Sequence, residues 1–117
     1  MKKLGVWGEE TAARFLEQKG YRIVERNFRC RAGEIDLIAH HGGCVIFIEV
    51  KTRRSKGYGS PAEAVGPYKR RHLQLAIECY LSRRTIENRP LRIDVIEITV
   101  ECGRPCIRHI RNAVERG

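Results

Sequence analysis

The chain has 117 residues, of which 42% are hydrophobic and 32% are charged, and its formal net charge is +9. This length suits one domain rather than two of ordinary size, and the hydrophobic share argues against intrinsic disorder. We therefore expect a single domain over residues 1–117, and the positive charge favours a polyanionic partner, with nucleic acid as the leading class.

The cysteines and the amino-terminal residues indicate a compartment. The cysteine number is odd, and Met1 to Trp7 carries charges without an apolar run, so we expect reduced thiols in the cytoplasm. Cys102 and Cys106 lack a second cysteine pair or a histidine cluster, so a zinc site is only weakly supported. The longest apolar run, Val45 to Ile48, is too short to span a membrane, and we expect no membrane partner.

The first third of the chain predicts a helix followed by a strand. Apolar residues recur at helical spacing from Gly8 to Lys19, and Gly20 stands where a C-cap glycine is expected. β-branched and aromatic residues predict a strand over Tyr21 to Asn27. The polar stretch from Arg29 to Gly33 predicts a turn or mobile loop.

Two antiparallel strands are predicted next, over Glu34 to Ala39 and Cys44 to Lys51. The residues between them, His40 to Gly43, have the length and glycine content of a hairpin loop, with His40 and His41 in a solvated turn. Cys44 to Ile48 is apolar on both alternating faces, which is typical of a strand covered on both sides. We expect it to be the central strand.

The remaining chain predicts a loop, a helix and two strands. Thr52 to Pro67 is rich in basic residues, glycine and proline, which favours a long loop with one helical turn at Ala62 to Ala64. An apolar stripe predicts a helix over Tyr68 to Leu81. A strand is predicted over Ile93 to Val100, and a last one over Ile107 to Ile110. The order is α-β-β-β-α-β, with a terminal strand after it.

The second predicted helix begins with three basic residues, Lys69, Arg70 and Arg71. Positive charge at a helix N-terminus opposes the macrodipole and is easier to understand if an anion binds there. A solvated basic face explains the same residues equally well, and both interpretations stay open.

Two charges end the most apolar predicted strand. Glu49 and Lys51 project from the same strand face, and burying either of them is costly without a partner. The hairpin would fold Asp36 back beside Glu49 on the neighbouring strand. Opposed carboxylates destabilise a sheet unless a cation lies between them, and oxygen ligands suit Mg²⁺ or Mn²⁺. We therefore predict a divalent-metal site at Asp36 and Glu49.

The arrangement of Asp36 and the run Glu49-Val50-Lys51 resembles the signature of the PD-(D/E)xK nucleases, which include restriction endonucleases and archaeal Holliday junction resolvases. One departure is Ile35, which replaces the proline of the superfamily's PD pair. Over nearly its whole length the chain is similar to the bacterial YraN-type family of predicted endonucleases. The similar segments are Gly8-Glu9 through Leu16, Gly20-Tyr21, Gly33 to Ala39, and the helix with Ala76 and Tyr80-Leu81.

The resemblance implies a fold, a site and an activity. The fold is an α/β, restriction-endonuclease-like three-layer core with a mixed central sheet flanked by helices. The activity is Mg²⁺-dependent hydrolysis of DNA phosphodiester bonds, on branched or otherwise structured DNA by analogy with the resolvases, which also implies a homodimer. Glu9 would join Asp36 and Glu49 as a metal ligand, with Glu10 as the fallback, although either acid also suits a first helical turn for electrostatic reasons alone.

In this mechanism the metal polarises the phosphate and activates a water that Lys51 orients. Basic residues beside the site would grip DNA phosphates without reading sequence. They are Arg53, Arg54, Lys56, Lys69 and Arg71.

Two alternatives come from other functional classes. One is a nucleic-acid-binding module that keeps the nuclease fold with little chemistry, against which the intact Asp36, Glu49 and Lys51 set argues. The other is a small ribosome- or RNA-associated protein, which only the charge supports. Asp94 is expected to pair structurally with Arg92 rather than to bind metal.

Overall fold

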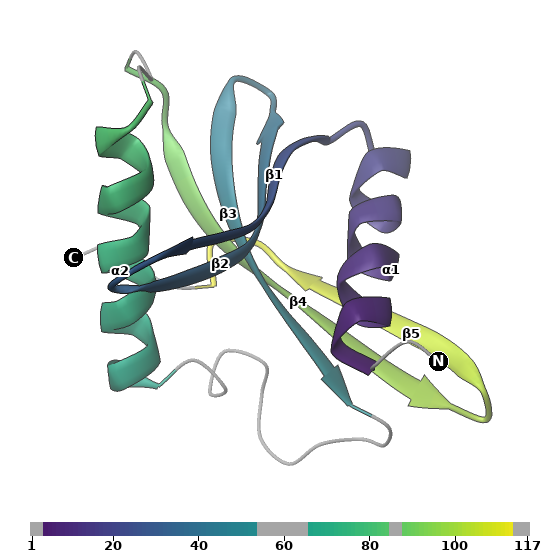
Figure 1. The fold of residues 1–117 in the computed structure, drawn as a ribbon. Helices are drawn as coiled ribbons and strands as arrows, with labels where there is room; N and C mark the ends of the chain where they lie inside the picture. The colour runs from purple at the N-terminus through teal and green to yellow at the C-terminus, as the bar shows by residue number, and fades with distance from the viewer. Residues whose placement is uncertain (1–3, 54–65, 85–87, 114–117) are drawn as a thin grey trace.

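The computed structural model of the protein describes residues 4–53, 66–84 and 88–113. The helices and strands follow the predicted order α-β-β-β-α-β, and a terminal strand completes it (Figure 1). No helix in the described ranges is both long and apolar enough to cross a membrane. The elements are α1 (Leu4–Gln18), β1 (Arg22–Cys30), β2 (Gly33–His41), β3 (Cys44–Arg53), α2 (Pro67–Ser82), β4 (Leu91–Glu101) and β5 (Arg104–Ile110).

The strands form one mixed sheet in the order β1-β2-β3-β4-β5. β1, β2 and β3 are consecutive antiparallel neighbours, β3 and β4 are parallel, and β4 and β5 form an antiparallel hairpin. The parallel pair needs a crossover connection, and α2 lies in that connection. β3 is therefore the middle strand, as its sequence predicted.

The two helices cover opposite faces of the sheet, and Figure 1 shows the sheet running between them. On one face, Phe47 of β3 packs in a cluster with Leu73 and Tyr80 of α2. On the other, Ile46 and Ile48 of β3 pack with Leu16 and other residues of α1. This burial on both faces explains why β3 is continuously apolar, and the three-layer α/β prediction is confirmed.

The predicted turn at Arg29 to Gly33 is wrong at both ends. Arg29 and Cys30 belong to β1, Gly33 begins β2, and only the two residues between them form the turn. Polar composition favoured a loop, but Phe28 is buried with its ring edge-to-face on Tyr80, 5.2 Å between centroids. That contact holds the end of the strand onto α2, so tertiary packing overrides the local pattern.

The β2–β3 hairpin is tighter than predicted. His40 and His41 are strand residues, and the turn is Gly42-Gly43, with φ of 57° and 77°. Positive φ at both positions is what a two-residue turn between twisted strands requires. His41 is not in a solvated turn, because its ring stacks on Tyr21 with centroids 3.9 Å apart.

The long connection after β3 is described only at its ends. Thr52 and Arg53 continue β3, and Pro67 starts α2. The helical turn predicted at Ala62 to Ala64 lies outside the described residues.

Candidate functional site

Asp36 and Glu49 lie on neighbouring strands at the point where β2 and β3 diverge. The last paired residues there are Leu37 and Ile48, so the two acids come next on each strand. Side-chain alternation places Glu49 on the same face as Phe47, which packs toward α2. Asp36 Oδ2 accepts a hydrogen bond from the Val50 N–H at 2.8 Å. The tight hairpin thus brings the two predicted acids together.

Both carboxylates are withdrawn from solvent, with 8% of Asp36 and 6% of Glu49 exposed. Burial and the nearby charge of Glu49 raise the pKa of Asp36 to about 7, despite the opposing hydrogen bond from Val50. Asp36 is therefore held in an environment that disfavours its charge at neutral pH. Such a carboxylate is a good site for a cation, because the cation would remove the cause of the shift.

Two lysines stand beside the acids. Lys69 Nζ, from the first turn of α2, lies 2.6 Å from Glu49 Oε1. Burial would lower the pKa of Lys69, but its hydrogen bonds to Glu49 and Lys51 raise it. The pKa of Lys51 is lowered, first by the hydrogen bond to Lys69 and then by burial. Lys51 thus gives up its proton more easily than an ordinary lysine.

The role of Lys69 was missed by the sequence reasoning, which placed it in a track of phosphate contacts. The signal was present, because an anion facing the basic residues at this helix N-terminus was one of the two interpretations left open. That anion is a carboxylate of the chain itself, Glu49.

Glu9 approaches the same acids from α1. Burial is the main cause of its raised pKa, with smaller contributions from Glu34 and Glu49, while a hydrogen bond to Asn27 opposes the shift. The charge of Glu9 also contributes to the raised pKa of Asp36. The neighbouring Gly8 permits this approach, because a Cβ there would collide with the Thr52 side chain of β3.

The donor set fits a hard divalent cation. Asp36 and Glu49 offer buried carboxylate oxygens, which Mg²⁺ and Mn²⁺ prefer. Across residues 4–53, 66–84 and 88–113, no group of three or more His, Cys, Asp or Glu side chains converges closely enough to hold a metal. Mg²⁺ is commonly held by one or two carboxylates together with waters and substrate phosphates, so two acids suffice chemically.

The other predicted phosphate contacts are dispersed. Arg53 lies on the same strand face as Lys51, and its Nη1 is 3.9 Å from Glu97 Oε2. Arg71 is exposed and lines a surface hollow with Pro67 and Gln74, on a different side of α2 from Lys69. Arg54 and Lys56 lie outside the described residues.

Glu34 does not join the acid pair. It lies on the surface with 58% of its side chain exposed and pairs with Arg29 across the β1–β2 hairpin at 3.2 Å. Glu34 is therefore a solvated surface acid.

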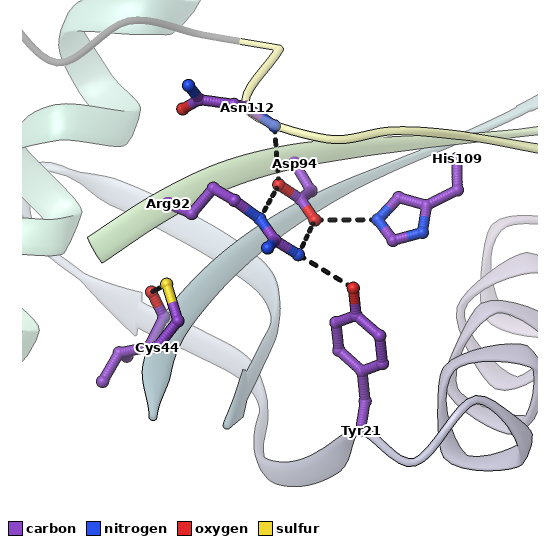
Figure 2. A network of polar contacts seen from close by, with 7 residues as sticks. Tyr21, Cys44, Arg92, Asp94, His109 and Asn112 are labelled. Atoms are coloured by element: carbon purple, nitrogen blue, oxygen red, sulfur yellow. Dashed lines mark hydrogen bonds and ion pairs between the residues drawn. The ribbon is translucent and has the colours of Figure 1, made fainter. Parts of the chain in front are cut away.

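A second buried acid, Asp94, lies in a separate polar network that stabilises the fold. Figure 2 shows its carboxylate between Arg92, His109 and the backbone N–H of Asn112. Arg92 donates to both oxygens at 2.8 Å, His109 Nε2 lies 2.7 Å away, and Asn112 N–H donates at 2.9 Å. Arg92 also donates to the Tyr21 hydroxyl at 2.8 Å, which ties β4 to the α1–β1 connection. The predicted Arg92–Asp94 pair is confirmed.

The fold and the site together define a class of protein. It is an α/β protein with a five-stranded mixed sheet between two helices. An acid pair and two lysines lie on the face of the sheet that α2 covers. The chain belongs to the family described as "Uncharacterised protein family UPF0102", whose model matches residues 8–98. This confirms the resemblance to the YraN-type family.

Relatives in that family match nearly the whole chain. The UPF0102 protein of Geobacter sulfurreducens is 49% identical over 115 residues, covering 97% of this chain and 90% of the relative. Those of Syntrophomonas wolfei and Symbiobacterium thermophilum are 47% and 49% identical, and each match covers 96% of this chain and 97% or 96% of the relative. Each of these matches spans at least 90% of the relative.

Proposed function

We propose that the protein is a metal-dependent endonuclease that hydrolyses DNA phosphodiester bonds. The observation that carries this proposal is the pair Asp36 and Glu49, two buried carboxylates side by side with the pKa of Asp36 raised to about 7. Burying such a pair opposes folding, and a function that needs a bound cation accounts for it better than packing does.

Each residue of the site has a proposed role in the hydrolysis. Asp36 and Glu49 would hold Mg²⁺ or Mn²⁺, with Glu9 of α1 adding negative charge nearby. When bound, the metal polarises the scissile phosphate and lowers the pKa of an attacking water. Lys51, with its lowered pKa, orients the attacking water and can donate to the developing negative charge on the phosphate.

Binding of DNA would draw on the positive charge of the whole chain. A net charge of +9 steers a polyanion toward the surface, and Arg53 continues the strand face that carries Lys51. Contacts of this kind bind phosphates irrespective of sequence, so we expect no base-specific target. Structured or branched DNA is proposed by analogy with the resolvases.

The test is cleavage of plasmid, single-stranded and four-way-junction DNA with Mg²⁺ or Mn²⁺. We expect Asp36→Asn, Glu49→Gln and Lys51→Met each to lower the rate by about 100-fold or more, as loss of a metal ligand or transition-state donor does. Glu34→Gln is the matched control and should keep full activity, because Glu34 is a surface acid of the same strand as Asp36. Undiminished cleavage in the three site variants would refute the proposal.

One observation favours a second candidate, a nucleic-acid-binding module without chemistry. The ammonium of Lys69 already pairs with Glu49 at 2.6 Å, which neutralises part of the acid pair without a metal.

If the site is a metal site, Lys69→Met should tighten Mn²⁺ binding by about tenfold, or about 1.4 kcal/mol, since a competing cation is removed.

Calorimetric titration with Mn²⁺ distinguishes the two candidates, and Arg70→Met is the control, since Arg70 is the next, exposed residue of α2. A binding module would take up no Mn²⁺ in either variant, and Lys69→Met would then only weaken its binding to DNA.

A further inference from the structure

Two cysteines from distant parts of the chain meet where the β1–β2 hairpin packs against α2. Cys30 is the last residue of β1, and Cys79 lies in the last turn of α2. Both are partly buried against the core cluster that contains Phe28 and Tyr80, whose rings are in edge-to-face contact. Figure 1 shows the end of the hairpin lying against the helix.

The Cys30 and Cys79 thiols are hydrogen-bonded to each other, and their surroundings shift the two pKa values in opposite directions. Burial would raise the pKa of Cys30, but hydrogen bonds from the backbone of Ala32 and Gly33, the Cys79 thiol and the charge of Arg83 lower it. Burial and the contact with Cys30 raise the pKa of Cys79. Cys30 is thus the more acidic thiol of the pair, and Cys79 is the partner that donates to it.

The positive charge beside the pair is fixed by packing. The Arg83 guanidinium lies over the Phe28 ring, 5.7 Å from its centroid, and Phe28 is two residues before Cys30 on the same strand face. A partly accessible thiol with a lowered pKa, next to a cation and a second thiol, is the arrangement found in redox-sensitive cysteine pairs.

We propose that Cys30 and Cys79 form a reversible disulfide when the protein meets a peroxide. The Cys30 thiolate attacks one oxygen of hydrogen peroxide and becomes a sulfenic acid, as the O–O bond breaks and hydroxide leaves. The Cys79 sulfur then attacks the Cys30 sulfur, its proton leaves with the hydroxyl group as water, and the S–S bond forms. In total the two thiols lose two protons and two electrons, and the peroxide takes them up to become two waters.

The cross-link would enclose the candidate site within one covalent ring. Asp36, Glu49, Lys51 and Lys69 all lie between the two cysteines in the chain. The disulfide would fix α2, which carries Lys69, to the hairpin that carries Asp36. Because a disulfide restricts the unfolded chain, the oxidised protein should melt at a higher temperature than the reduced protein.

The remaining cysteines serve as internal controls. Cys102 and Cys106 are exposed on the β4–β5 hairpin, which lies away from α2 in Figure 1. The Cys44 thiol is directed at the backbone oxygen of Val45, 3.8 Å away, as Figure 2 shows.

The test oxidises the reduced, full-length protein with hydrogen peroxide and maps the products by mass spectrometry without reduction. Cleavage after glutamate separates the two cysteines, because it cuts after Glu25, Glu34 and Glu78. We expect one linked pair of peptides, containing Cys30 and Cys79, that dithiothreitol separates. In the Cys79→Ser variant, oxidation should stop at a Cys30 sulfenic acid, which dimedone traps. The Cys30→Ser variant should form no linked pair.

The double variant Cys102→Ser/Cys106→Ser is the matched control and should oxidise like the parent protein. Oxidation of Cys102 and Cys106 while Cys30 and Cys79 stay reduced would overturn the proposal, as would equal rates of oxidation at all five thiols. The readout is mass rather than DNA cleavage, so the result is independent of the proposed nuclease function.

Discussion

Asp36 is the side chain whose energetics say most about the site. A carboxylate that is 8% exposed beside Glu49 is disfavoured in its charged form, and its single backbone hydrogen bond does not offset this. In the unfolded chain the same group would ionise near 3.8. The folded protein therefore keeps a proton on Asp36 over a range of pH in which the unfolded chain releases it.

This difference predicts how stability varies with pH. Because the folded state holds the extra proton between about pH 4 and pH 7, the contribution of Asp36 to stability falls as pH rises through that window. Asp36→Asn removes the charge and keeps an oxygen for the Val50 N–H. At pH 8 the variant should be more stable than the parent by about 2 kcal/mol, with little difference at pH 4.

Urea denaturation of both proteins without divalent metal, at the two pH values, measures this effect. An equal difference in stability between the two proteins at both pH values would show that ionisation of Asp36 does not destabilise the folded state. Saturating Mg²⁺ should reduce the advantage of Asp36→Asn at pH 8, because a cation stabilises the ionised carboxylate of the parent protein.

Asp94 is the opposite case, a buried acid whose charge is fully satisfied. Burial would raise its pKa, but the hydrogen bonds from His109, Arg92 and the Asn112 backbone lower it. An acid with a lowered folded pKa contributes stability above its unfolded value, near 3.8, and this contribution is lost as pH falls through the folded value.

We therefore expect Asp94→Asn to destabilise the protein at pH 7 by about 3 kcal/mol, since removing one partner of a buried ion pair leaves the other uncompensated. Glu101→Gln, at the exposed end of the same strand, should change stability by less than about 0.5 kcal/mol. The loss should shrink as pH is lowered below about 4. A loss that is constant with pH would show that the Asp94 carboxylate does not contribute to stability through its charge.

At the scale of elements, the packing of α2 on the β1–β2 hairpin positions the site. A Cβ added at Gly33 would lie 2.9 Å from the backbone oxygen of His72, which cannot move without moving the helix. Gly33 thus sets how closely α2 approaches the sheet, and with it the reach of Lys69 to Glu49.

Gly33→Ala should accordingly destabilise the protein by about 1–3 kcal/mol, because overpacking forces the backbone to shift. Gly5→Ala is the control, since nothing lies within 4 Å of a Cβ at that helical position, and it should be neutral or slightly stabilising. Thermal or urea unfolding compares the two variants. Equal stabilities would mean that α2 does not rest on the hairpin at Gly33.

The elements themselves were predictable where the local pattern and the tertiary packing agree. The apolar run Cys44 to Ile48 predicted a central strand because burial on both faces leaves no polar positions. The stretch from Arg29 to Gly33 was mispredicted because its strand pairing depends on Phe28 meeting Tyr80, a residue 52 positions later in the sequence. Propensity over a short window carries no information on such a contact.

On the scale of the whole molecule, the sequence could predict which acids meet but not what else reaches them. A tight hairpin and strand alternation suffice to bring Asp36 beside Glu49. Lys69 reaches Glu49 only because α2 crosses back over the sheet between β3 and β4, a placement that depends on the complete topology. The same holds for the meeting of Cys30 and Cys79.

The charge of the whole chain gives a prediction for DNA binding. If Arg53 contacts phosphate, Arg53→Gln should make the dependence of log binding constant on log salt concentration shallower by about one. Arg14→Gln, on the exposed side of α1, should leave the slope unchanged. Fluorescence anisotropy over a series of salt concentrations measures both. Equal slopes for the two variants would remove Arg53 from the DNA-binding surface.

The proposed nuclease activity depends on a cation between Asp36 and Glu49. Anomalous diffraction from crystals soaked in Mn²⁺ tests this most directly, with Asp36→Asn/Glu49→Gln crystals soaked alongside. We expect an anomalous peak within coordination distance of both carboxylates in the parent protein and no peak there in the double variant. A parent crystal with Mn²⁺ bound elsewhere, or with Lys69 still on Glu49 and no peak at the pair, would contradict the metal-dependent nuclease.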